Sequence, residues 1–205
     1  MERPAVLSTS ALTEVRSITD PSAAAKLRRA PGPLGDAIEF GRADDRGLAM
    51  KVQRTADRVS IGELLAAYVD TVNRKDYDGL RELFTADAFV DLGPAGECRG
   101  VDAIVTTIGT QVDAMQGLIQ VVHTGTVRFA ADDESSATGR WYISEFGVMG
   151  GGTEAYFSGV YHDEYVRDPS GEWRFGVRRY RGLFARRGAD TVVRPFPTDL
   201  PPPWS

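Results

Sequence analysis

The sequence has few of the side chains that build disulfides and metal centres. It contains one cysteine, Cys98, and two histidines, His123 and His162, which lie far apart in the chain. A lone cysteine excludes an internal disulfide, and two separated histidines without a carboxylate at ligand spacing argue against a transition-metal site. No glycine-rich phosphate loop and no nucleophile elbow occurs. We therefore expect no metal and no cofactor.

Long apolar runs are also missing. No stretch approaches the ~18 apolar residues of a membrane span, and residues 1–20 do not resemble a secretory signal. The net charge of −5 disfavours a nucleic-acid partner. We expect a cytoplasmic protein that binds neither membranes nor nucleic acids.

The chain of 205 residues provides one compact domain with extensions. Residues 1–55 show no sustained periodicity and contain the helix breaker Ala-Pro-Gly-Pro-Leu-Gly at 30–35. Residues 188–205 are rich in proline, which cannot continue the interior of a sheet. We predict a partly irregular N-terminal extension over 1–55, a domain over 56–187, and a C-terminal tail over 188–205 that drapes over the domain or a partner subunit.

Hydrophobic periodicity predicts the elements of the domain. Between about Val59 and Arg74, apolar residues recur at helical spacing, and Tyr68 lies on the buried face with Ile61 and Leu65. Further helices are predicted over 78–84 and 101–116, a short strand over 88–92, and long strands over 119–130, 136–148, 154–167 and 173–183. Helices followed by a run of long strands predict an α+β domain, with a curved antiparallel sheet wrapped around three helices.

Polar residues on apolar strand faces are candidates for a pocket. Side chains alternate along a strand, so His123 shares a face with Val121 and Gly125, and Glu145 shares one with Trp141. We therefore expect His123, Glu145 and Trp141 to point inward. In the next strand either the Tyr161–Asp163 set or the set containing His162 can point inward, and a solvated position for either polar residue stays open.

Simpler structural interpretations also stay open. Tyr68 could be a core tyrosine bonded to a carbonyl, and His123 could be a satisfied core histidine. Glu145 could pair with an arginine, and Asn73 could cap its helix.

Several short patterns occur along the domain, namely Tyr68-x4-Asn73-x2-Asp76-x7-Phe84-x2-Asp87-Ala88, Arg99-Gly100-x2-Ala103-Ile104, Gly159-x-Tyr161-x-Asp163 and Gly171-x-Trp173. Together they resemble the SnoaL-like branch of the nuclear transport factor 2-like superfamily, which includes polyketide cyclases, ketosteroid isomerases, and scytalone and bile acid dehydratases. The resemblance covers about Val59 to Phe184. The resemblance implies a cone-shaped cavity between helices and sheet, but this superfold supports many reactions.

The resemblance also assigns residues. Tyr68 and Asp163 take the positions of the two oxyanion donors of ketosteroid isomerases, whereas Leu92 replaces their proton-transferring aspartate. Asn73 stands where related dehydratases carry a pocket aspartate, and His162 matches a pocket asparagine of scytalone dehydratase. An amide cannot take a proton at neutral pH, so a catalytic base must lie elsewhere.

His123 is the leading candidate for that base, because the related dehydratases have a histidine in the corresponding strand and an imidazole titrates near neutral pH. Glu145 is the second, since burial would raise its pKa. Tyr68 would then stabilise a negative oxygen, with Glu145 or Asp163 supporting the histidine. The expected substrate-binding residues are Asn73, Leu92, Trp141 and His162.

These residues favour a cofactor-independent lyase or isomerase that acts by dehydration or proton transfer. Its substrate would be a hydrophobic polycyclic or aromatic compound of steroid, polyketide or terpenoid type. We also expect a homodimer or a higher homo-oligomer. The alternative is a non-catalytic module of the same fold that binds a hydrophobic ligand or mediates dimerisation. Convergence of Tyr68, His123 and Glu145 on one cavity would favour the enzyme.

Overall fold

The computed structural model describes residues 42–130 and 133–198. The described residues from Arg46 onward form a compact unit of their own, to which all the strands belong. The helical elements are α3 (Arg42–Arg74), α4 (Tyr77–Arg81), the 3-10 turn η1 (Gly93–Ala95) and α5 (Val101–Asp113). The strands are β1 (Phe84–Asp91), β2 (Glu97–Arg99), β3 (Met115–Phe129), β4 (Ser136–Met149), β5 (Glu154–Arg167), β6 (Trp173–Arg187) and β7 (Asp190–Val193).

The strands form one seven-stranded sheet in the order β2-β1-β6-β5-β4-β3, with β7 paired to β6. The expected α+β class is confirmed, but the sheet is mixed, because β1 runs parallel to β6 while the other pairs are antiparallel. A parallel pair needs a long crossover, and α5 with the β3–β5 meander supplies it. Bulges in the β3–β4 and β5–β6 pairs add local twist to the curved sheet.

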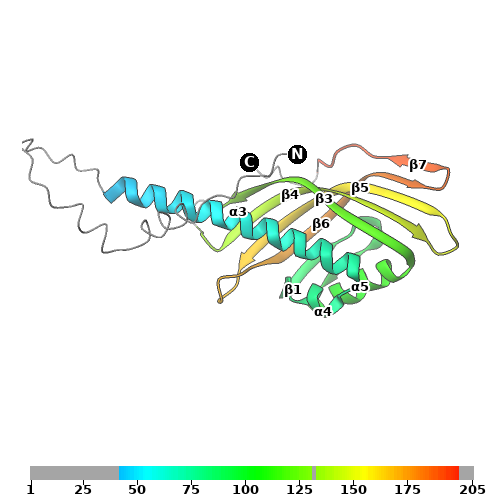
Figure 1. The fold of residues 1–205 in the computed structure, drawn as a ribbon, viewed down its shortest axis with the longest axis horizontal. Helices are drawn as coiled ribbons and strands as arrows, with labels where there is room; N and C mark the ends of the chain where they lie inside the picture. Colours follow the sequence, from blue (N-terminus) through cyan, green and yellow to red (C-terminus); the bar gives the residue numbers. More distant parts are fainter. Residues whose placement is uncertain (1–41, 131–132, 199–205) are drawn as a thin grey trace, which may run out of the picture. The chain divides into compact units, whose positions relative to one another are not determined.

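Helix α3 presents the predicted apolar face to the sheet. Ile61, Leu65, Tyr68 and Val72 are all buried. The helix crosses one face of the sheet, and α4 and α5 lie near its C-terminal end (Figure 1). The ring of Tyr68 packs edge-on against Phe175 of β6, with centroids 5.8 Å apart. The helices and the concave face of the sheet therefore share one core.

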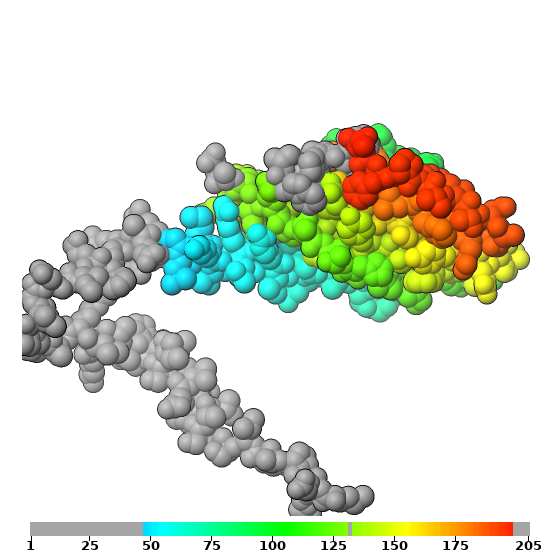
Figure 2. Space-filling view, turned by 90° about the horizontal axis from the view of Figure 1, so that it is seen from above, coloured from blue at the N-terminus to red at the C-terminus, as the bar shows by residue number. Residues whose placement is uncertain are grey.

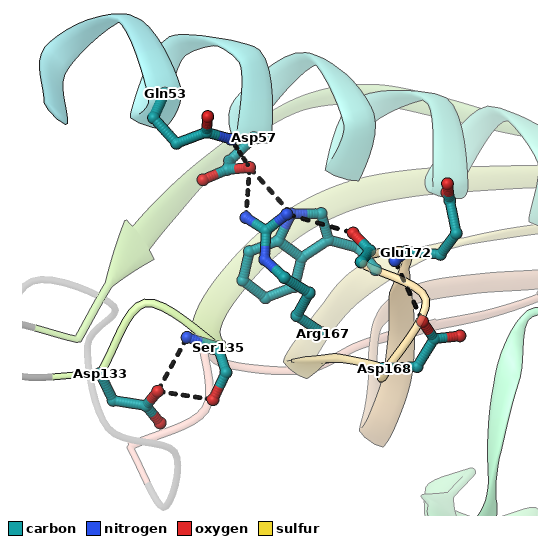
Figure 3. A network of polar contacts seen from close by, with 9 residues as sticks. Gln53, Asp57, Asp133, Ser135, Arg167, Asp168 and Glu172 are labelled. Atoms are coloured by element: carbon teal, nitrogen blue, oxygen red, sulfur yellow. Dashed lines mark hydrogen bonds and ion pairs between the residues drawn. The ribbon is translucent and has the colours of Figure 1, made fainter. Parts of the chain in front are cut away.

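The first half of α3 differs from the prediction, because the helix begins at Arg42 rather than near Val59. Asp57 anchors this half: its carboxylate accepts hydrogen bonds from Arg167 and from Trp173 at 3.3 Å (Figure 3). Burial opposes ionisation of Asp57, but the bonds from Arg167, Gln53 and Trp173 outweigh it and lower the pKa of Asp57. Polar contacts hold this part of the helix against the sheet, so its sequence lacks the apolar repeat that predicts a helix. The rest of the predicted 1–55 extension, residues 1–41, lies outside the described part of the chain.

The C-terminal segment partly returns to the sheet. After Gly188, whose φ of 55° allows a tight turn, β7 pairs with the end of β6. Beyond β7, Phe196 packs against Tyr142 with ring centroids 6.4 Å apart. In Figure 2 this end of the chain, drawn in red, lies against the strands. Residues 188–198 thus include one unpredicted strand and a contact with the sheet, while the rest of the predicted tail, residues 199–205, lies outside the described part of the chain.

Candidate active site

A cavity of about 590 Å³ lies between the helices and the concave face of the sheet. Apolar side chains dominate its wall; they include Val72, Leu92, Ile108, Val112, Leu118 and Phe157. Polar side chains enter it from α3 and from strands β3 to β6, namely Tyr68, Gln120, Glu145, Tyr161 and Tyr180. Such a volume suits an organic molecule of moderate size, and an apolar wall with a few polar groups is typical of small-molecule sites.

Gln120, Glu145 and Tyr161 form a hydrogen-bonded group inside the cavity. The Gln120 amide donates to Glu145 Oε1 at 2.6 Å and to the Tyr161 hydroxyl at 3.2 Å. Tyr68 meets Tyr161 edge to face, with ring centroids 6.0 Å apart. A carboxylate and two phenols therefore face the same space. The buried Gln120 Oε1 has no hydrogen-bond partner among the described residues, so a ligand hydroxyl could donate to it.

Asn73, at the end of α3, positions this group from behind. Its side chain accepts a bond from the Gln120 backbone N–H at 2.7 Å and donates to the Gln120 carbonyl at 3.0 Å. The paired bonds join the helix to β3 beside the cavity. Asn73 does not line the cavity; its side chain holds the Gln120 backbone, and its predicted part in substrate binding stays a prediction.

The ionisable groups of the cavity have shifted protonation equilibria. Burial raises the pKa of Glu145 above its ordinary value, although the bond from Gln120 opposes the shift. Burial likewise raises the pKa of Tyr68, against the positive charge of Arg178, and it raises the pKa of Tyr161 well above its ordinary value. Burial and the nearby Glu145 carboxylate raise the pKa of Tyr180. At neutral pH the three phenols are hydrogen-bond donors, and Glu145 is the group able to take a proton.

A buried ion pair lies beneath the two phenols. Arg178 donates to both carboxylate oxygens of Asp163 at 2.9 and 2.8 Å, and neither side chain is exposed to solvent. The guanidinium carbon lies 4.1 Å from the ring centroids of both Tyr68 and Tyr161. Tyr165 also donates to Asp163 at 2.9 Å. This positive charge next to the phenols stabilises negative charge that develops at their hydroxyl groups.

His123 is placed on the opposite side of the sheet from the prediction. It is exposed, does not line the cavity, and its Nε2 lies 2.9 Å from the Ser144 hydroxyl. A bulge in the β3–β4 pairing between Val122 and Gly125 shifts the alternation by one residue. The alternate residues that point inward after the bulge therefore belong to the outward-pointing set before it, and His123 lies in that outward set.

Three further predicted residues do not reach the cavity. Asp163 points inward but is held in the ion pair with Arg178, and its predicted catalytic role stays a prediction. His162 lies on the other face, where its Nε2 accepts from Arg140 at 3.0 Å. Trp141 points inward but donates to the Tyr165 hydroxyl at 2.9 Å, and it does not line the cavity.

Tyr68, Glu145 and Leu92 do line the cavity, as predicted. Of the three groups whose convergence would favour an enzyme, Tyr68 and Glu145 share the cavity and His123 does not. Prediction missed Gln120, although its alternation with Leu118 and Val122 was a readable signal. It also missed Tyr180 and the arginines of β6, because the alternation of side chains in the late strands is compatible with either face pointing inward.

Within residues 42–130 and 133–198, no cluster of three His, Cys, Asp or Glu side chains could hold a metal ion. Over the same residues, no helix has the length and apolar character needed to cross a membrane.

Sequence relatives match about two thirds of the chain. The uncharacterized protein Rv2910c of Mycobacterium tuberculosis is 28% identical over 138 residues, which cover 66% of this chain and 90% of the relative. An uncharacterized protein of Mycobacterium bovis matches to the same extent.

Solved structures with similar folds include enzymes. A hexachlorocyclohexane dehydrochlorinase of Novosphingobium barchaimii has a TM-score of 0.62 at 19% identity, over 71% of this chain and 99% of that one. A proposed scytalone dehydratase of Novosphingobium aromaticivorans has a TM-score of 0.63 at 18% identity, over 74% and 99%. A nuclear transport factor 2-like protein of Salmonella enterica has a TM-score of 0.58 at 16% identity, over 63% and 92%. At these identities the likeness shows the fold.

The model of the SnoaL-like domain matches residues 53–179, which include α3 from Gln53 onward, strands β1 to β5, the first part of β6 and the Arg178–Asp163 pair. The chain therefore belongs to the SnoaL-like domain family, within the nuclear transport factor 2-like superfamily.

Proposed function

We propose that the protein is a cofactor-independent lyase or isomerase that works by proton transfer on a hydrophobic polycyclic or aromatic compound. One observation carries the proposal: Glu145 and protonated tyrosines meet in one apolar cavity, and Gln120 holds both Glu145 and Tyr161. A steroid, polyketide or terpenoid skeleton suits the cavity volume of about 590 Å³. The dehydrochlorinase and the proposed dehydratase of similar fold support this class of reaction.

In the proposed mechanism, Glu145 removes a proton from a carbon next to a carbonyl group. Tyr68 and Tyr161 donate to the oxygen as it becomes negative, and Arg178 beneath the rings stabilises that charge. Return of the proton to another carbon completes an isomerisation, whereas departure of a group from the neighbouring carbon completes an elimination. A raised pKa brings Glu145 nearer to the working pH, which makes it effective both as base and as acid.

The bicyclic ketone β-tetralone tests this mechanism, because exchange of its α-protons for deuterium is visible by nuclear magnetic resonance. The wild-type protein should accelerate exchange, and Glu145→Gln should reduce the acceleration by roughly 10²–10⁴-fold, the usual contribution of a general base. Tyr68→Phe should reduce it less, since other donors remain. Glu154→Gln is the control, because Glu154 is exposed and does not line the cavity. Full activity of Glu145→Gln would show that another group is the base.

The second candidate function is a binding or dimerisation module of the same fold. It is favoured by exposed apolar side chains of the sheet, notably Ile119 (56% exposed) and Phe146 (49% exposed). Such side chains suit the interface of a homodimer. Tight binding of β-tetralone without any acceleration of exchange would favour this module, and sedimentation of the wild type against Phe146→Glu tests the interface.

A further inference from the structure

Arginines gather on one side of the cavity wall. Arg181 and Arg187 come from β6, and Arg194 follows β7. Together with Glu145 they are the charged residues that line the cavity. Arg187 and Arg194 are exposed while Glu145 is half-buried, so these two arginines mark the mouth and the carboxylate lies deeper.

Two of the three arginines carry charge without an acidic partner. Arg181 forms an ion pair with Asp91 at 2.7 Å. Arg187 and Arg194 form no ion pair with any residue of the described chain. The Arg187 guanidinium instead lies 4.9 Å above the ring centroid of Phe157, which also lines the cavity. A free cation stacked on the apolar wall is available to a ligand.

The fold keeps these charges at the mouth. The Arg194 backbone N–H donates to the Leu183 carbonyl at 2.8 Å, and β7 pairs Asp190 with Arg187 in the hairpin that leads to Arg194. Tyr180 also lines the cavity and lies within electrostatic range of both kinds of charge: burial and the Glu145 carboxylate raise its pKa, whereas Arg194 and Arg187 lower it.

We propose that the cavity takes an apolar compound bearing a carboxylate group, which Arg187 and Arg194 bind at the mouth while the apolar body extends inward. Arginine matches a carboxylate through parallel charge-assisted hydrogen bonds. The assignment of the reacting end to Glu145 rests on the proposed function. Binding energy from this remote group would orient the reacting end, and separation from Glu145 avoids repulsion between two carboxylates.

Naphthaleneacetate and its neutral analogue naphthaleneacetamide test the proposal by calorimetric titration, because they differ in charge and hardly in shape. The wild type should bind the acid more tightly, and this preference should weaken with salt. Arg187→Gln and Arg194→Gln should each weaken binding of the acid by roughly fivefold, as expected for an exposed ion pair, and leave the amide unaffected. Arg186→Gln is the matched control, since Arg186 is the exposed neighbour of Arg187 that does not line the cavity.

Equal affinity of the wild type for both compounds would overturn the proposal, as would an Arg186→Gln effect as large as that of Arg187→Gln. A large gain in affinity for the acid in Glu145→Gln would place the carboxylate at the deep end and overturn it too. A negative result in these binding titrations is distinguishable from a negative result in the test of proton transfer. Binding needs no turnover, and loss of β-tetralone exchange in Glu145→Gln needs no carboxylate on the ligand.

Discussion

Asp163 should contribute to stability rather than to chemistry, and Asp163→Asn separates the two roles. The wild-type carboxylate accepts two bonds from Arg178, at 2.9 and 2.8 Å, and one from Tyr165 at 2.9 Å. Asparagine has a single acceptor oxygen and no charge, so the guanidinium would remain buried without a counter-ion. Arg178 is fully buried, with 0% of its surface exposed, and cannot recover its hydration without a structural change.

The expected loss in the free energy of unfolding follows from this burial. Breaking a buried ion pair by removing one partner typically costs about 3–5 kcal/mol. The rings of Tyr68, Tyr161 and Phe175 lie 4.1, 4.1 and 4.0 Å from the guanidinium carbon, but they already stabilise the cation in the wild type and offset none of the loss. For a domain of this size, each kcal/mol lowers the melting temperature by about 2–4 °C, so we expect a fall of roughly 6–20 °C.

Urea unfolding followed by tryptophan fluorescence measures the loss, and the double variant Asp163→Leu with Arg178→Met is the comparison. Removing both charges avoids an unpaired ion, so the double variant should be more stable than Asp163→Asn. Below its melting temperature, Asp163→Asn should retain β-tetralone exchange within a few-fold of wild type. Unchanged stability together with abolished exchange would refute this reasoning and return Asp163 to a chemical role.

Three other predictions test the site. His123→Ala should leave exchange unchanged, because His123 is exposed and bonds Ser144 at 2.9 Å outside the cavity; a tenfold loss would contradict the assignment. Asn73→Ala should reduce exchange about tenfold and displace its pH profile, because Gln120 loses two bonds that position it beside Glu145; a change in affinity alone would favour direct substrate contact. The rate of exchange should increase as pH rises through the raised pKa of Glu145, because the base is then ionised. The free energy of unfolding should fall as pH rises from about pH 4.3 to that raised pKa, because the folded state holds the Glu145 proton more tightly than the unfolded chain does. In Glu145→Gln, neither the exchange rate nor the free energy of unfolding should keep the part of its pH dependence that is due to Glu145. Unfolding curves at several pH values measure the effect on stability.

Much of the fold was predictable because its signals are local. The strand limits Glu154–Arg167 were predicted correctly, and the start of β4 at Ser136 was too. Periodicity also assigned Tyr68 and Glu145 to the inner face, where the structure places them. The parallel β1–β6 pair was not predictable in this way, because strand order depends on hydrogen bonds between distant segments.

By itself, the sequence determined the long strands, the apolar face of α3 and the inward direction of two site residues, since each depends on a repeat between neighbouring residues. Only the tertiary structure decided the rest of the site. The bulge beyond Val122 separated His123 from the inward set that contains Gly125, and the β5–β6 pairing made Asp163 the counter-ion of Arg178. The return of β7 along β6 brought Arg194 to the cavity beside Arg187. Register shifts and long-range pairing change which face a side chain occupies without changing the local pattern, and that is why these positions required the folded chain.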